Sequence, residues 1–212
     1  MQHIYCISGL GADHRLFAKI SIPGYTLIAV PWVPFAPADT LVTYAAKMSA
    51  QIPGDDPIIM GVSFGGMLAS EIAKMRPVQK AILISSAKVR AEVGYHSPLY
   101  AMLHKVVPAW CFGRTYWLLL YRLGARTREE RMLLAAMLRD SSRPFGKWAT
   151  RAILNWKSTD CTDNILQLHG TADKVIAAAN VQPDHWIAGG SHIMVYNRAG
   201  EVSEVVRKAL AQ

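Results

Sequence analysis

Gly61-Val62-Ser63-Phe64-Gly65-Gly66 is the stretch from which the fold of this 212-residue chain can be worked out. Residues 56–60 before it form a short apolar run typical of a buried strand, and residues 67–75 after it carry apolar side chains at helical spacing. We therefore predict a strand, a tight turn and a helix, with Ser63 at the turn. The glycines of the turn have no Cβ atom, so the strand and the helix can cross closely and lift the serine hydroxyl above the sheet edge.

The backbone of this turn has a chemical property of its own. The amide of Phe64 opens the predicted helix, and amides at a helix N-terminus can donate to a negative oxygen beside the Ser63 hydroxyl. The same residues also fit a glycine-rich turn that contains an incidental serine. A histidine and a carboxylate in matching strand-end loops would decide between these interpretations.

Short apolar strands alternate with helices on both sides of the turn. The expected strands are residues 4–7, 25–30, 56–60, 81–84, 164–168 and 184–188. Helices are expected at 16–20, 40–51, 67–75 and 175–179, and from about residue 193 or 198 to the end. This alternation predicts an α/β fold with a doubly wound, mostly parallel sheet of about six strands. Active groups collect at the carboxyl ends of such strands, where four loops lie: 8–13, 61–66, 169–173 and 189–192.

The alternation stops between residues 88 and 160, where aromatic and basic residues recur at helical spacing and predict an insertion of three to five short helices. This segment holds 13 Lys and Arg against 5 Asp and Glu, whereas the rest of the chain holds ten of each. The whole net charge of +8 therefore lies in the insertion. This excess charge is typical of a solvated helical surface, and weak contact with an anionic membrane surface or attraction of acidic substrates is the alternative. Nucleic-acid binding is not expected, because no nucleic-acid module is visible.

Composition limits the classes of protein that the chain can belong to. A hydrophobic fraction of 51% and a charged fraction of 18% describe a folded globular protein. No apolar run approaches the length of a membrane span, about 20 residues, and no basic leader precedes the first strand. Cys6, Cys111 and Cys161 lack metal-ligand spacing and fit reduced thiols, so we expect a cytoplasmic protein with no metal and no cofactor.

A serine nucleophile needs a base, and that base needs an orienting carboxylate. Of the seven histidines, only His192 follows the last expected strand in a loop that leads into the final helix. Asp173 follows the preceding strand at the same sheet edge, with Asp13 in the first loop as the main competitor. Asp163 precedes its strand and so lies at the opposite edge, and His169 reads as a structural residue in a tight turn.

The order Ser63, Asp173, His192 and its motifs resemble the α/β-hydrolase superfamily. The matching segments are Gly61 to Gly66, His169-Gly170-Thr171-Ala172-Asp173-Lys174-Val175 and Gly189-Gly190-Ser191-His192. The resemblance implies Ser63 as nucleophile, His192 as general base and then acid, and Asp173 as orienter. It also implies a hydrolase core at 1–87 and 161–212, without the family's leading hairpin, and a helical cap at 88–160.

The first loop departs from the family pattern. Family members commonly carry a His-Gly pair there, whereas this chain has Ser8-Gly9. Because a backbone amide is the donor, the loop can still complete an oxyanion hole, which we place at Leu10, with Gly11 possible, together with Phe64. Trp32 and Trp117 are the expected walls of the substrate pocket, and packing roles are the alternative for both.

These features predict a serine hydrolase that cleaves an ester or thioester of a small-molecule acyl substrate through an acyl-enzyme. The same triad serves C–C bond hydrolysis, peroxidase and lyase chemistry, which the sequence does not separate from ester cleavage. A membrane-surface or ligand-binding protein with a vestigial triad is the alternative outside enzymology.

Overall fold

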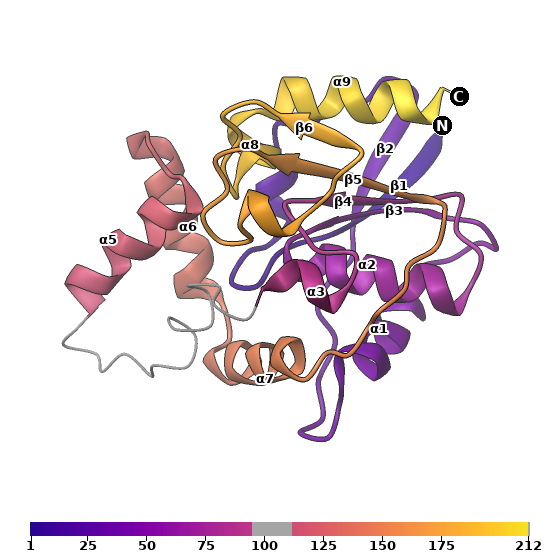
Figure 1. The fold of residues 1–212 in the computed structure, drawn as a ribbon, viewed down its shortest axis with the longest axis horizontal. Coiled ribbons are helices and arrows are strands. Elements are labelled where there is room, and N and C mark those ends of the chain that lie inside the picture. Colours follow the sequence, from indigo (N-terminus) through magenta and orange to yellow (C-terminus); the bar gives the residue numbers. More distant parts are fainter. Residues whose placement is uncertain (95–111, 212) are drawn as a thin grey trace.

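The computed structural model describes residues 1–94 and 112–211, with the side chains of residues 112–117 left out. The described residues form one sheet of six parallel strands in the order β2-β1-β3-β4-β5-β6 (Figure 1). The strands are β1 (Gln2–Ile7), β2 (Tyr25–Ala29), β3 (Ile58–Val62), β4 (Lys80–Ile84), β5 (Ile165–Gly170) and β6 (His185–Ile187). The prediction of a doubly wound parallel sheet is therefore confirmed.

The centre of the sheet is β3, the strand that leads into the Ser63 turn. All five of its residues are buried, as expected for an apolar run with neighbours on both sides. Its register pairs Gly61 with Ile7 of β1 and Val62 with Ile84 of β4. The carboxyl ends of these strands consequently meet at one edge.

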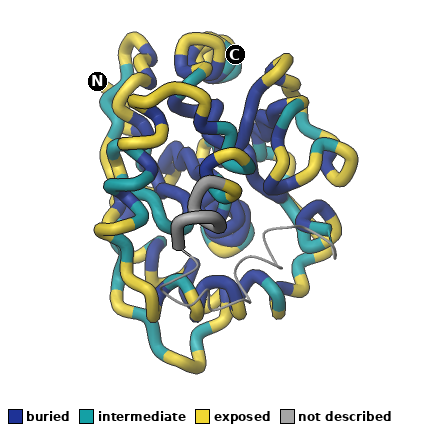
Figure 2. The backbone as a smooth tube through the Cα atoms, turned by 90° about the vertical axis from the view of Figure 1, so that its left-hand side faces the viewer, coloured by how far each residue is buried: buried dark blue, intermediate teal, exposed yellow. Residues whose placement is uncertain are grey.

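Helices cover both faces of the sheet. The helical segments are η1 (His14–Phe17), α1 (Leu41–Ser49), α2 (Phe64–Met75), α3 (Arg90–Val93), α5 (Phe112–Leu123), α6 (Arg128–Asp140), α7 (Arg143–Leu154), η3 (Ala178–Asn180), α8 (Met194–Asn197) and α9 (Ala199–Leu210). One buried cluster joins α1, α2 and α7 to the sheet, and a second joins η1, α6, α8 and α9 to the other face. Figure 2 shows the buried parts of the chain gathered in the interior.

Several boundaries differ from the sequence predictions, but the helix after Ser63 begins at Phe64, the residue whose amide was predicted to open it. Strand β5 extends through His169 and Gly170, so His169 lies in a strand and not in a turn. The C-terminal helix is split at Arg198 into α8 and α9.

The insertion between β4 and β5 contributes α3, α5, α6 and α7 to the described part of the chain. Residues 95–111 of the predicted cap lie outside the described residues. Helix α7 shares a buried cluster with α1 and α2, whereas α6 shares the second cluster with η1, α8 and α9. The division of the chain at residues 87 and 161 stays a prediction. None of the helices that the structure describes is long and apolar enough to cross a membrane.

An aromatic cluster attaches α7 to the core. The ring of Trp148 lies 4.5 Å from that of Tyr44 and stacks on Phe35 at 5.1 Å. Its indole N–H donates to the carbonyl of Asp39 at 3.0 Å. A large buried side chain with a satisfied polar atom fixes the position of a helix better than apolar area alone.

Replacing Trp148 with alanine should lower the free energy of unfolding by about 3–5 kcal/mol, because a large cavity replaces the ring. Urea denaturation of the whole chain measures this effect. Met132 on α6 is the control, since its side chain is 62% exposed and its alanine variant should change stability by less than about 0.5 kcal/mol. Equal losses in the two variants would show that the aromatic cluster does not anchor α7.

Candidate active site

Ser63 lies between β3 and α2 in a backbone conformation that non-glycine residues rarely adopt. Its φ is 53° and its ψ is −118°, and a residue held there carries strain of about 1–3 kcal/mol. Neighbouring glycines make the turn possible, because a Cβ on Gly61 would overlap the carbonyl of Gly65, and one on Gly65 would overlap that of Ile7. The predicted close crossing of strand and helix is therefore present.

The turn is also held by the strand beside it. Ser63 N–H donates to the carbonyl of Ile84 at 3.0 Å, and the Ser86 hydroxyl donates to the carbonyl of Ser63 at 2.6 Å. Both polar groups of the Ser63 backbone thus have partners from the end of β4. These bonds hold the strained residue in one orientation.

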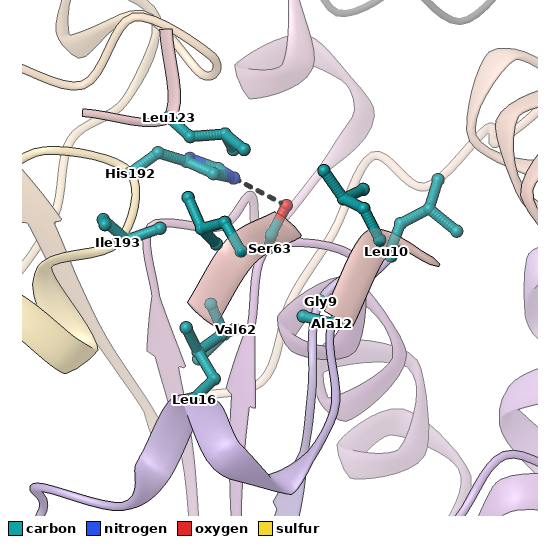
Figure 3. A pocket seen from close by; sticks show the side chains of 12 residues that line it. Gly9, Leu10, Ala12, Leu16, Val62, Ser63, Leu123, His192 and Ile193 are labelled. Carbon is teal, nitrogen blue, oxygen red and sulfur yellow. Dashed lines mark hydrogen bonds between the residues drawn. The ribbon is translucent and has the colours of Figure 1, made fainter. Parts of the chain in front are cut away.

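The Ser63 hydroxyl points toward His192, as the dashed line in Figure 3 marks. Ser63 Oγ lies 2.9 Å from His192 Nε2, and His192 Nδ1 lies 2.8 Å from Asp173 Oδ2. Because a carboxylate only accepts, Nδ1 carries the proton and donates to Asp173, which leaves Nε2 free to accept from Ser63. The structure therefore brings the three predicted triad residues into one hydrogen-bonded line.

The carboxylate of Asp173 is held on both oxygens. Oδ1 accepts from the amides of Val175 at 2.8 Å and Ile176 at 3.1 Å, while Oδ2 faces His192. Asp173 and His192 are both buried, whereas Ser63 is partly exposed. The base and its partner are thus shielded from water, and the hydroxyl remains open to a substrate.

Asp13, the competing carboxylate, belongs to a different set of contacts. It caps η1 by accepting from Arg15 N–H, and it binds the Arg15 guanidinium, which holds the pKa of Asp13 below its usual value. Arg15 also binds Asp140 at the end of α6 at 2.8 Å. Arg15 therefore ties the first loop to the insertion in this structure.

The predicted oxyanion-hole residues lie on either side of the serine. Phe64 is the first residue of α2, so its amide has no acceptor within the helix. Leu10 lies in the first loop, close to Ser63 in the pocket shown in Figure 3. The use of their amides for an oxyanion stays a prediction.

Two cavities meet at Ser63 and His192. The larger has a volume of about 220 Å³ and the smaller about 50 Å³. The residues that line both are Leu10, Gly11, Ser63, Leu123, Leu138 and His192. The larger cavity is further walled by Phe64, Leu119, Phe145, Ile153 and Val175, with Ser141, Ser142 and Arg143 among its polar lining. Its described walls are thus mainly apolar.

Neither predicted tryptophan can be assigned to these walls. Trp32 packs on Phe64 and Phe145 at ring distances of 5.8 and 5.0 Å, so it supports two wall residues from behind. It is not among the described residues that line either cavity. Trp117 lies on α5, and its side chain is outside the described residues.

The sequence analysis did not single out three leucines of the insertion that line the cavities: Leu123, Leu134 and Leu138. Leu134 and Leu138 are spaced by one helical turn on α6, and both face the smaller cavity. From the sequence, this spacing indicates that the two leucines lie on a buried face of a helix. It does not indicate whether that face packs on the core or lines the active site.

The insertion also contacts the loop that carries His192. The amide of Ile193 donates to the carbonyl of Leu123, the last residue of α5, at 3.3 Å. At the next position Gly124 has φ 87°, and a Cβ there would overlap the side chain of Ser191. The end of α5 is therefore packed directly against both neighbours of His192.

Comparisons with known proteins identify the family and the fold of the chain. The model of the alpha/beta hydrolase family matches residues 4–205. A hydrolase from Oleispira antarctica has a TM-score of 0.76 at 13% identity, covering 100% of this chain and 92% of that protein. An esterase from Exiguobacterium antarcticum has a TM-score of 0.71 at 15% identity, with coverage of 100% and 92%.

A lipase-esterase related protein from Clostridium acetobutylicum has a TM-score of 0.71 at 12% identity, covering 98% of this chain and 93% of that protein. At such identities the likeness shows a shared fold. A search of curated proteins gives no match. Because the family match spans nearly the whole chain, the protein belongs to the alpha/beta hydrolase family and is an enzyme of that class.

Proposed function

We propose that this hydrolase cleaves an ester or thioester through an acyl-enzyme on Ser63. The observation that carries the proposal is the hydrogen-bonded line from Ser63 Oγ through His192 to Asp173, with distances of 2.9 and 2.8 Å. Backbone strain of this kind persists mainly at active sites, so a strained serine aligned with a buried acid–base pair argues against a vestigial triad.

The reaction follows from these contacts. His192 Nε2 takes the hydroxyl proton as Ser63 Oγ bonds to the substrate carbonyl carbon, and the amides of Leu10 and Phe64 donate to the resulting oxyanion. Each such donor lowers the barrier by about 3 kcal/mol. The imidazolium of His192 then gives its proton to the departing alcohol or thiol, and an ester of Ser63 remains.

Water completes the cycle by the same route. His192 takes a proton from the water as its oxygen attacks the acyl carbon, and the second oxyanion collapses to release the acid and return the proton to Ser63. Asp173 keeps Nδ1 of His192 protonated throughout, so that Nε2 always faces the serine.

The cavity walls favour a neutral small-molecule substrate with an apolar acyl group. Burial of apolar substrate surface against Phe64, Leu138, Phe145 and Val175 contributes about 25 cal/mol per Å². A charged acyl chain would lose its hydration wherever it lies against these apolar side chains.

Labelling with a fluorophosphonate, followed by mass spectrometry of the labelled peptide, tests the proposal directly. We expect the probe on Ser63, and a burst of p-nitrophenol from p-nitrophenyl butyrate as the acyl-enzyme forms. Thioester substrates with the same acyl group, run in parallel, decide between the two leaving groups. A folded protein that takes no label and releases no p-nitrophenol would contradict the proposal.

Leu138 should act as a specificity residue, because it lines both cavities and reaches Gly11 of the first loop. In the variant Leu138→Ala, we expect the preference for branched over linear acyl groups to rise about tenfold, the effect of about one methylene in an apolar pocket. A panel of p-nitrophenyl esters measures the ratio of kcat/KM values.

Leu118→Ala is the matched control, since the Leu118 side chain on α5 is 48% exposed and lines neither cavity. Its ratio should equal that of the wild type. An unchanged ratio in Leu138→Ala would show that the acyl group does not reach the boundary of the two cavities.

A further inference from the structure

His169 is a buried titratable residue that the mechanism above does not use. Its side chain has no exposed surface and lies at the end of β5, beneath the turn that carries Asp173. Its Nε2 is 3.0 Å from the carbonyl oxygen of Ile176 and 3.5 Å from Asp173 Oδ2. Trp186 of β6 meets the ring edge-on, at 6.1 Å between centroids.

These contacts determine which ring nitrogen carries the proton. Within the described part of the chain, Nδ1 is buried and has no hydrogen-bond partner. A proton on Nδ1 would leave a buried donor unsatisfied and would set the Nε2 lone pair against two oxygens. A proton on Nε2 satisfies the Ile176 carbonyl and turns a positive N–H edge toward the carboxylate. Burial lowers the pKa of His169, which keeps the ring neutral, although the Asp173 charge opposes this shift.

The backbone of Ile176 is consequently held at both of its polar groups. Its N–H donates to Asp173 Oδ1, and its carbonyl, in the next peptide group, accepts from His169. The position of this residue's backbone sets the direction of the carboxylate, and the carboxylate sets that of His192 at 2.8 Å. A series of direct contacts thus leads from His169 to the proposed base.

We propose that His169 is a positioning residue for the Asp173–His192 pair: its Nε2–H fixes the backbone of Ile176 and, through the N–H of that residue, the orientation of the Asp173 carboxylate. The kinetic part rests on the proposed function, since it takes this pair as the acid–base partner of Ser63. The structural part does not depend on that function.

The first test needs no variant. Long-range ¹H–¹⁵N correlation spectra of the whole protein at neutral pH report the tautomer of each histidine. We expect the Nε2–H tautomer for His169 and a downfield Nδ1–H proton for His192. An Nδ1–H tautomer at His169 would overturn the proposal, whether or not the protein hydrolyses esters.

The second test compares donors of different reach at the same position. In His169→Gln the amide nitrogen can occupy the place of Nε2, whereas in His169→Asn it reaches only the place of Nδ1. We expect His169→Gln to keep kcat for p-nitrophenyl butyrate within about threefold, and His169→Asn to lose about ten- to a hundredfold with KM little changed, since small misplacements at a reacting centre have effects of this size. The downfield proton of His192 should persist in His169→Gln and weaken in His169→Asn.

Trp186→Leu is the control for packing, because it removes the ring contact and leaves the donor in place. It should keep the wild-type kcat. Wild-type kcat in His169→Asn, or equal losses in the Gln and Asn variants, would overturn the proposal. A wild type that neither takes the fluorophosphonate nor turns over ester would contradict the proposed function instead, and the histidine spectra would still decide the role of His169.

Discussion

Ser63→Ala should fold like the wild type and lose the ability to hydrolyse esters. Alanine keeps the same Cβ atom and therefore the same backbone strain, so the only group lost is a hydroxyl that donates to His192. Stability should change by about 1 kcal/mol or less. Without a nucleophile, no acyl-enzyme forms, and kcat should fall by at least about 10⁴-fold, leaving only what the oxyanion amides and substrate binding supply.

Fluorophosphonate labelling and p-nitrophenyl ester turnover, with circular dichroism as evidence of folding, measure this result. Ser70→Ala is a suitable control, because Ser70 is a fully buried serine on the same helix whose hydroxyl donates to the carbonyl of Lys88. It should label normally. Labelling that survives in Ser63→Ala would place the nucleophile elsewhere in the chain.

Asp173→Asn should be nearly as severe, although the substitution changes only one atom. The amides of Val175 and Ile176 will keep the side-chain oxygen in place of Oδ1, so the new NH₂ group must face His192. His192 then has to accept at Nδ1 and carry its proton on Nε2, where it cannot take one from Ser63. A wrong tautomer of this kind lowers kcat by about 10⁴-fold.

Steady-state kinetics with an activated ester measures the loss, and the spectrum of His192 should show the Nε2–H tautomer. Asp163→Asn provides the control, since Asp163 is an exposed carboxylate before the start of β5, at the far edge of the sheet. Full activity in Asp173→Asn would mean that another acid, such as Asp13, orients the base.

The sheet and the triad were predictable because each depends on a short local pattern. Residues 58–62 are all apolar or glycine and lie at the centre of the sheet, and the parallel direction of the strands follows from their separation by helices. Ser63, Asp173 and His192 each follow the end of a strand, and parallel strands bring such ends to one edge. Three distant residues could therefore be placed together without coordinates.

The pocket and His169 were not predictable in the same way. In the sequence, the position of Leu138 indicates only that one face of α6 is apolar. The contact of this face with Gly11 and Ser63 depends on how the insertion packs on the core. His169 before a glycine resembled a turn, but the strand continues to Gly170, where the backbone lies against that of Gly190 too closely for a side chain. Both roles depend on contacts between segments far apart in the sequence.

The packing of Gly124 against Ser191 also limits how such a protein can be rebuilt. A chimera that exchanges residues 88–160 for the corresponding segment of a relative would replace Leu123 and Gly124, whose contacts lie beside the base. Any donor segment with a side chain at position 124 would push the His192 loop away from Ser63. The insertion that sets the substrate range therefore also holds the catalytic loop in this chain. A transplanted segment that brings a new specificity must keep a glycine at position 124.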